Sequence, residues 1–280
     1  SPPPPSPPCP GHTFSSREEL RTAVSEYDSG AAVAIEKYGP IADWCVCPGV
    51  TNMRDLFKGL RNFNADISKW DTSCVTDMDS MFENAKAFNN GGKPLTFSTS
   101  SVTDMGDMFK GASAFNQPVK FDTKGVTDMD GMFEDAHTFN QKIEFTDTSK
   151  VTDMSDMFEG ASAFNQPIKF DTKSVTDMSD MFKDAHNFNQ KIEFTDTSQV
   201  TDMADMFHGA SAFNQKVEFD TSSVKDMSGM FHDASDFNQP LDFKTASVTN
   251  MAGMFAEAEK FNQPIKFDDT SSVKNMGGMF

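Results

Sequence analysis

Carboxylates recur along this chain at a regular spacing, and they are its clearest candidates for ligand chemistry. A first series follows the pattern Val-x-Asp-Met and comprises Asp77, Asp104, Asp128, Asp153, Asp177, Asp202 and Asp226. A second, partial series comes three residues later, at Asp107, Asp156, Asp180 and Asp205. Because Ca²⁺ prefers oxygen ligands, stacked copies could bind it weakly at Asp153, Asp156, Asp177, Asp180, Asp202 and Asp205. The stronger interpretation is that each Asp of the first series caps a helical turn of its own unit.

Histidines and threonines also recur in equivalent positions. His208 and His232 occupy the same slot in consecutive units, and His137 and His186 match each other two units apart, so either pair could share a metal. Surface histidines without a role are the stronger interpretation. An unbroken threonine series could match ice or a carbohydrate, but neighbouring aspartates such as Asp122 and Asp171 spoil an uncharged ice face. This series comprises Thr72, Thr99, Thr123, Thr148, Thr172, Thr197, Thr221, Thr245 and Thr270.

Nothing in the sequence predicts an enzyme. There is no unique nucleophile and base, no glycine-rich phosphate loop, and no break in the pattern where a pocket would form. The formal net charge of −18 argues against a nucleic-acid partner, which requires a basic surface. No apolar run is long enough to cross a bilayer. We expect no cofactor apart from the candidate Ca²⁺.

The four cysteines all lie in the first quarter of the chain, at Cys9, Cys45, Cys47 and Cys74. Their even number predicts two disulfides. If Val50 stacks on Val75, Cys47 and Cys74 lie on adjacent coils within disulfide reach, which leaves Cys9 for Cys45. The alternative is a zinc site, although Cys-x-Cys is not the usual ligand spacing and only His12 is nearby.

These side chains belong to a repeated unit, which must position them. Val-x-x-Met recurs at spacings of 24–27 residues, with its valines at Val50, Val75, Val102, Val126, Val151, Val175, Val200, Val224, Val248 and Val273. All 19 methionines fall in two slots of the unit. Residues 102–150 nearly repeat as 151–199, so alternate units are more alike than neighbours. The pair, 49 residues long, is the more recent duplication.

A unit this short cannot bury its own apolar face, so neighbouring units must stack into a solenoid. Within each unit, Ile-x-Phe and Val-x-x-Met predict short parallel strands, and a segment such as Asp-Met-Ser-Asp-Met-Phe predicts a one-turn helix. We expect a polyproline arm over residues 1–12, a helical N-terminal cap over 13–40, and about ten coils of roughly 25 residues over 41–280. The valines, methionines, alanines and phenylalanines should face inward, with coils about 4.8 Å apart.

Two columns of the stack follow from this arrangement. The residue inside Ile-x-Phe runs Lys120, Glu144, Lys169, Glu193, Glu218, Asp242 and Lys266, so its first four members alternate in sign, as pairing between adjacent strands favours. The Asn of Phe-Asn-Gln forms a ladder able to satisfy backbone groups of the turns. That ladder comprises Asn89, Asn116, Asn140, Asn165, Asn189, Asn214, Asn238 and Asn262.

The unit resembles a known family. Val-Thr-Asp-Met-Ser-Asp-Met-Phe-x-Gly-Ala-x-x-Phe-Asn-Gln-Pro-Ile, followed by Trp-Asp-Thr or Phe-Asp-Thr, is similar to the BspA-like surface-protein repeats, a divergent leucine-rich-repeat-like family. The segment Phe14–Val24, continuing to Trp44, resembles that family's helical lead-in. The resemblance implies a leucine-rich-repeat-like solenoid, secreted or displayed at the cell surface, with adhesion or envelope roles. Phe in place of Trp in later repeats, and Cys45-Val46-Cys47, depart from the family pattern.

The first residues have a different composition from the repeats. Ser-Pro-Pro-Pro-Pro-Ser-Pro-Pro is typical of an extended polyproline II segment. It resembles the hydroxyproline-rich, O-glycosylated stretches of plant and algal wall proteins. The chain starts at a residue other than Met, which is compatible with a processed N-terminus.

These observations lead to two functional hypotheses. The first is an extracellular structural protein, a subunit of a filament, appendage or wall layer, whose partners are further copies or other extracellular structural proteins. Its expected assembly residues are Val273, Met276, Met279 and Phe280 in the last unit and Pro2, Pro3, Pro4 and Pro5 in the arm. The second is a cell-surface adhesin that binds a protein, a glycan or Ca²⁺ on the face of the solenoid.

Overall fold

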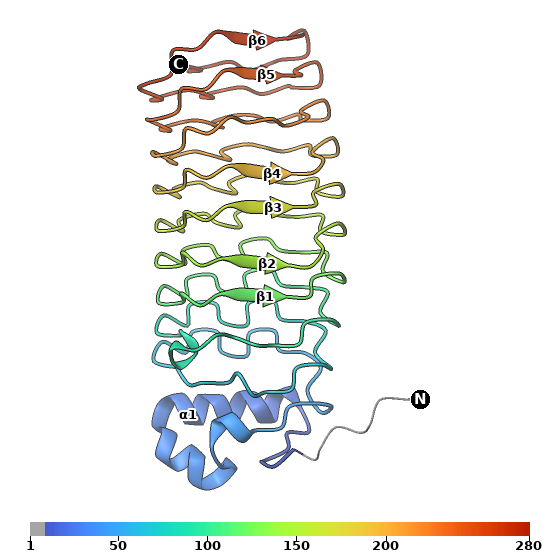
Figure 1. Ribbon diagram of the computed structural model, residues 1–280, viewed down its shortest axis with the longest axis vertical. Coiled ribbons are helices and arrows are strands. Elements are labelled where there is room, and N and C mark those ends of the chain that lie inside the picture. Colours follow the sequence, from blue (N-terminus) through green and yellow to red (C-terminus); the bar gives the residue numbers. More distant parts are fainter. Residues whose placement is uncertain (1–8) are drawn as a thin grey trace.

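The chain forms a long stack of coils with a helix against its first coil (Figure 1). The structure is a computed structural model and describes residues 9–280. Successive coils lie one above another from residue 50 to the last residue, so each repeat position forms a column along the stack. The expected assembly residues Pro2, Pro3, Pro4 and Pro5, and most of the expected 1–12 arm, lie outside the described residues.

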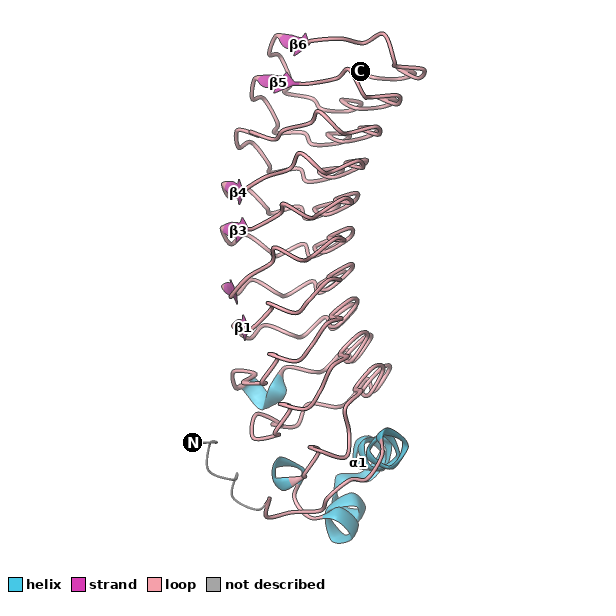
Figure 2. Cartoon of the chain, turned by 90° about the vertical axis from the view of Figure 1, so that its right-hand side faces the viewer, coloured by secondary structure: helices cyan, strands magenta, loops and turns pink. Residues whose placement is uncertain are grey.

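The helix α1 (Arg17–Tyr38) begins the described fold. Ser16 caps it by accepting a hydrogen bond from the Glu19 amide, and non-helical torsions at Gly30 divide it into two segments (Figure 2). Leu20 and Val24 are buried, and the Arg17 and Arg21 guanidinium groups donate to main-chain carbonyls of Arg54 and Asp55 in the first coil. The 3₁₀ turn η1 (Ile41–Asp43) then leads into the stack.

Three two-stranded parallel sheets lie on one face of the stack. They pair β1 (Val119–Phe121) with β2 (Ile143–Phe145), β3 (Ile168–Phe170) with β4 (Ile192–Phe194), and β5 (Leu241–Phe243) with β6 (Ile265–Phe267). The register places Lys120 opposite Glu144 and Lys169 opposite Glu193, which confirms the expected alternation of sign along this column.

A difference of one residue between alternate units accounts for this pairing. Each of the three sheets joins a coil of 24 residues to a following coil of 25, counted from valine to valine. The extra residue follows the second strand and is Thr146 in the coil of β2 and Thr195 in that of β4. The Thr146 hydroxyl donates to Asp122 Oδ1 of the previous coil at 2.8 Å, and Thr195 makes the equivalent bond to Asp171. The 49-residue pair is therefore a structural unit as well as a sequence duplication.

The core is continuous from the first coil almost to the last. The Val, both Met, the Ala and the first two Phe of the central units are fully buried, as the sequence predicts. Rings of equivalent phenylalanines stack coil upon coil, for example Phe133 on Phe158 with centroids 5.6 Å apart. Because each ring contacts its counterparts in adjacent coils, the apolar face of every coil is covered by its neighbours.

The expected one-turn helices are wrong: in the described coils, these segments are successions of tight turns. Alternate amides donate to the next coil, from Met154 to Asp177 O at 3.1 Å, from Phe158 to Met181 O at 2.9 Å and from Gly160 to Lys183 O at 2.8 Å. Amides used between coils cannot also form the i to i−4 bonds of an α-helix. The only 3₁₀ segment beyond residue 50 is η2 (Asn90–Gly92). It lies in the 27-residue unit between Val75 and Val102, where these three residues are additional to the 24-residue pattern.

These turns place two columns of residues in the left-handed region. The first includes Asp107, Gly131, Asp156, Asp180 and Asp205, with φ between 50° and 55°. The second alternates in residue type, as Asn84, Gly111, Asp135, Gly160, Asp184 and Gly209. Gly, Asn and Asp adopt this conformation most readily, which explains why these residue types fill both columns except at Ser80 and Glu257.

The alternation in the second column has a steric cause. A Cβ placed on Gly160 would lie well inside 3.0 Å of Asp135 Oδ1 in the previous coil, and Gly209 stands in the same relation to Asp184. An Asp carboxylate thus occupies the space that the following Gly leaves empty. This match also favours a two-coil repeat.

We expect Gly160→Ala to destabilise the stack more than Gly253→Ala does. Both glycines have positive φ, but a Cβ on Gly253 meets nothing within 4 Å, so that variant carries only the backbone cost of about 1 kcal/mol. Gly160→Ala adds the overlap with Asp135, and a second change, Asp135→Gly, should remove that excess. Denaturant midpoints of the four proteins measure it. Equal destabilisation by the two alanine variants would contradict the steric explanation.

Candidate functional site

The first aspartate series forms a ladder along one edge of the stack. Its members, from Asp77 to Asp226, are joined from coil to coil by parallel bridges. In each, Oδ1 accepts a hydrogen bond from the amide two residues later, as in Asp153 to Ser155 at 2.9 Å. Asn52 and Asn250 flank the series and donate from Nδ2 to Oδ2 of Asp77 and Asp226, at 2.7 and 3.0 Å. The expected capping role is thus fulfilled at turns, with no helix involved.

The second series lies at the left-handed turn positions. Asp180 contacts Lys183, whose Nζ is 3.0 Å from both Asp180 Oδ1 and Glu159 Oε1. Asp205 Oδ1 lies 2.8 Å from His208 Nδ1. Asp180 and Asp205 therefore each have a partner within this chain, whereas Asp107 Oδ1 is buried without a hydrogen-bond partner among the described residues.

The six carboxylates of the candidate Ca²⁺ site do not converge. Within residues 9–280, no three His, Cys, Asp or Glu side chains are placed together as metal ligands. The six residues form two separate columns, one of Asp153, Asp177 and Asp202 and another of Asp156, Asp180 and Asp205. In the first column, each Oδ1 already accepts a hydrogen bond from a backbone amide. The geometry shows turn-stabilising carboxylates and assembles no cation cage.

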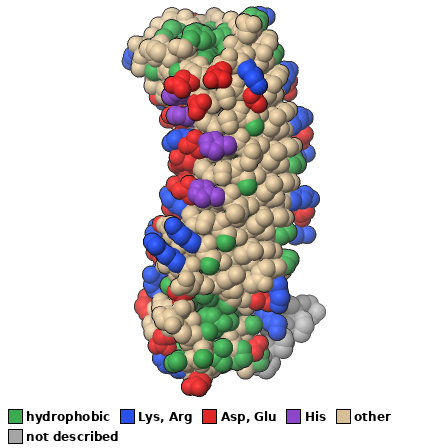
Figure 3. Space-filling model, turned by 90° about the vertical axis from the view of Figure 1, so that its left-hand side faces the viewer, with side chains coloured by type: hydrophobic (Ala, Val, Ile, Leu, Met, Phe, Trp, Pro, Cys, Tyr) green, Lys and Arg blue, Asp and Glu red, His purple; other side chains and the backbone are tan. Residues whose placement is uncertain are grey.

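The histidines lie on the same edge as the acidic columns (Figure 3). His137 and His186 each place Nδ1 2.8 Å from a carbonyl of the next coil, that of Gly160 and that of Gly209. Because a carbonyl only accepts, Nδ1 carries the proton and Nε2 of the neutral ring remains an acceptor. The rings of His208 and His232 stack with centroids 4.3 Å apart. A shallow hollow of about 650 Å³ is lined by His137 and His186 and, between them in the stack, by Gly160 and Glu159.

The threonine series proposed for ice or carbohydrate binding is buried, so that hypothesis is wrong. From Thr72 to Thr245 its members are at most 3% exposed. Their hydroxyls bond main-chain carbonyls of the next coil, as Thr148 does to Asp171 at 2.9 Å. A second threonine series directly follows the inward valines and is more accessible, as at the exposed Thr152, which donates to Thr127 O at 3.1 Å.

The asparagine ladder matches its expected structural role. Asn140 Oδ1 accepts from the Asn165 amide at 3.0 Å and from Gln166 Nε2 at 2.9 Å. The same pattern continues through the other members of the ladder. These amides fix the corner of each coil to the next.

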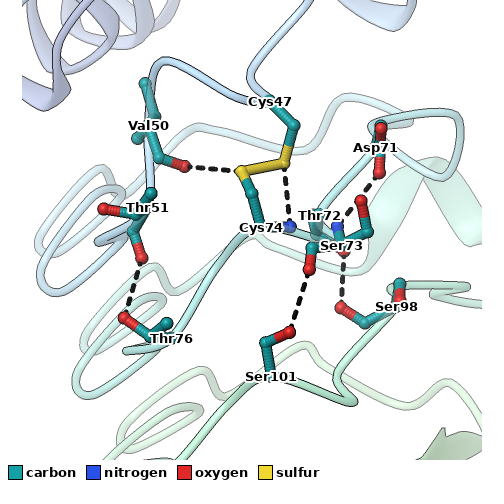
Figure 4. Close-up of a disulfide and its surroundings, with 10 residues drawn as sticks. All are labelled: Cys47, Val50, Thr51, Asp71, Thr72, Ser73, Cys74, Thr76, Ser98 and Ser101. Carbon is teal, nitrogen blue, oxygen red and sulfur yellow. Dashed lines mark hydrogen bonds between the residues drawn. A yellow bond between two sulfur atoms is a disulfide. The ribbon is translucent and has the colours of Figure 1, made fainter.

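Two disulfides fasten the first coils. Cys9 is bonded to Cys45 with their Cα atoms 5.9 Å apart, and Cys47 to Cys74 with Cα atoms 5.7 Å apart. Figure 4 shows the second bond joining adjacent coils, where Cys74 Sγ also lies 3.3 Å from Val50 O. These are the pairs expected from stacking Val50 on Val75, and they leave no thiolate for zinc.

The last coil carries the expected assembly residues of the solenoid. Phe280 is 75% exposed and Met276 42%, while Val273 and Met279 are partly buried. The Phe280 ring stacks on Phe255 at 5.7 Å. This edge is the surface on which any further coil would stack, whichever molecule supplies it.

Two features of the surface were missed in the sequence. The left-handed columns could have been found, because each is restricted to Gly, Asp, Asn, Ser and, once, Glu. The lysines at Lys110 and Lys183, each bridging an Asp and a Glu, could not, because their partners lie on different coils.

Comparison with known proteins adds a family. A family model described as "Mycoplasma protein of unknown function, DUF285" matches residues 22–142, 95–195, 119–218 and 186–280, which together span 22–280. No curated protein and no solved structure matches the chain significantly. None of the helices in residues 9–280 has the length and apolar character needed to span a bilayer.

We call acidic edge the edge of the stack that bears the two aspartate series, and we expect it to make the free energy of unfolding depend on pH. Burial raises the pKa of Asp156 to about 8, with further contributions from Glu159 and Asp180. Because the folded pKa exceeds the unfolded one, folding takes up a proton between about pH 4 and about pH 8, and stability falls as pH rises through that window. Asn also tolerates a positive φ, so Asp156→Asn should remove this contribution.

The measurement is the denaturation midpoint of wild type minus that of Asp156→Asn, at several pH values. The difference should become less favourable to wild type from pH 4 to pH 8. Asp196→Asn is the matched control with the opposite sign, since the Ser198 amide lowers the pKa of Asp196 and its contribution is lost as pH falls. A pH-independent difference for Asp156 would contradict the prediction.

Proposed function

The chain belongs to the DUF285 family, and from that premise we propose that it is an extracellular structural protein, a rod-shaped subunit of a filament, appendage or wall layer. The observation that supports this most is the unbroken stack, in which one side-chain pattern recurs from residue 50 to 280 and each coil depends on its neighbours. Such solenoids offer length and a repeated surface.

The two disulfides support an extracellular location. Disulfides persist in oxidising compartments and are rare where thiols are kept reduced. Both lie at the start of the stack, where Cys9–Cys45 and Cys47–Cys74 tie the helical lead-in and the first two coils together. In this proposal α1 acts as an N-terminal cap, and the coil is a divergent leucine-rich-repeat-like, BspA-like unit.

A cell-surface adhesin is the second candidate. The observation in its favour is the hollow between His137 and His186, where polar groups of three coils surround Gly160. Its occupant would be a protein or a glycan held by the solenoid edge. No catalytic step is part of either proposal.

Scattering and electron microscopy of the native protein test the structural role. We expect unbranched rods, associating further as concentration rises, and no free thiol by mass spectrometry under non-reducing conditions. Compact particles or four reactive thiols would contradict the proposal. Rods that remain single at all concentrations and bind isolated cell-wall material would favour the adhesin.

A further inference from the structure

The face that bears β1–β4 has a charge pattern with a particular symmetry. We call strand face the outward residues of these strands: Lys120, Glu144, Lys169 and Glu193, with the preceding column of Pro118, Lys142, Pro167 and Lys191. Its lysines are well exposed, Lys120 at 81% and Lys169 at 77%. Clusters of opposite sign follow one another along this face, seen edge-on at the right of Figure 3.

The contacts within one molecule leave much of this charge accessible. Lys120 Nζ is 3.7 Å from Glu144 Oε2, and Lys169 Nζ is 3.8 Å from Glu193 Oε2, both at the limit of an ion pair. Lys142 and Lys191 contact the glutamate of their own strand at 2.6 and 3.1 Å. Each glutamate thus has one close lysine and remains partly exposed.

From β1 to β4, the residues between Ile or Val and Phe carry charges in the order plus, minus, plus, minus. Reversing the order of the coils therefore reverses the sign of the charge at every position. A two-fold axis parallel to the strands and passing between β2 and β3 would reverse the order of the coils in a second copy. Glu144 would then face Lys169 of that copy, and Lys120 would face its Glu193. The same operation sets Lys142 opposite Pro167 and Pro118 opposite Lys191, so no equal charges meet within either column.

We propose that two copies of this chain associate face to face and antiparallel through the strand face. This inference rests on the proposed structural function and specifies how the rods associate laterally. A parallel two-fold arrangement would place each lysine opposite its own copy, which is repulsive. The antiparallel pairing is therefore the closed, isologous arrangement that the charges favour.

The association is electrostatic in origin, and its salt dependence follows. Exposed ion pairs are weak and screened, and the Debye length falls from about 30 Å at 0.01 M to about 8 Å at 0.15 M ionic strength. The dimer should be populated at low salt, and its dissociation constant should rise about tenfold or more over that range.

Charge exchange on the strand face tests the proposal. One variant carries Lys120→Glu with Lys169→Glu, and a second carries Glu144→Lys with Glu193→Lys. Each alone presents one sign along the central column, so neither should dimerise. An equimolar mixture should dimerise again, because every position then meets its opposite. Sedimentation velocity of full-length protein at about 0.01 M and about 0.15 M salt measures this.

The control variant is Lys124→Glu with Lys173→Glu, which makes the same change in net charge at exposed lysines outside the strand face. It should dimerise like wild type. Monomeric wild type at low salt, equal loss in the control, or no recovery in the mixture would each overturn the inference. Scattering on the same samples separates the two proposals: single rods that do not pair refute only the strand face, whereas compact particles refute the structural role itself.

Discussion

The fold depends on hydrogen bonds that pass from each coil to the next. Along a segment such as 154–160, alternate amides donate to carbonyls one coil later, and the threonine ladder repeats this direction. The asparagine ladder runs the other way, because the amide of each later coil donates to the Asn Oδ1 of the coil before it. A single coil has too few internal bonds and too little apolar surface to be stable alone. Secondary structure is accordingly sparse, with short strands on one face and turns elsewhere.

The columns of like residues are a direct result of this stacking. Aspartates separated by about 25 residues in sequence become neighbours, and the structure accommodates their charge in two ways. In the first series, Oδ1 accepts a hydrogen bond from a backbone amide. Lysines such as Lys183 lie between an aspartate of the second series, Asp180, and a glutamate of the previous coil, Glu159. Where compensation is incomplete, as at Asp156, burial and neighbouring carboxylates raise the pKa. The geometry of the turns, which favours Asp at these positions, therefore accounts for the acidic edge without a ligand.

Repetition made much of this structure predictable. Inward valines, methionines and phenylalanines, stacked coils, the disulfide between Cys47 and Cys74 and the asparagine ladder all follow from aligning the units. The tight turns could not be predicted in this way, because Asp-Met-Ser-Asp-Met-Phe has the local features of a helix start. The segment is not helical because its amides donate to carbonyls of the next coil. The buried threonines were misplaced for a related reason. A repeated polar threonine is expected at the surface from sequence alone, because the carbonyl that its hydroxyl binds lies in the next coil and is known only from the structure.

The one-residue difference between alternate coils constrains how such a chain can lengthen or shorten during evolution. Removing the coil of Gly160 alone would set Asp135 beside Asp184 in the second left-handed column, and removing the coil of β2 alone would set Lys120 beside Lys169. Removing two consecutive coils would restore every neighbour relation, including Asp135 to Gly160 and Lys120 to Glu144. Within residues 102–199, recombination in steps of two coils thus preserves these contacts, whereas the consecutive 24-residue coils from Val200 to Val248 interrupt the alternation. The near identity of residues 102–150 and 151–199 is the trace that such a step would leave in the gene.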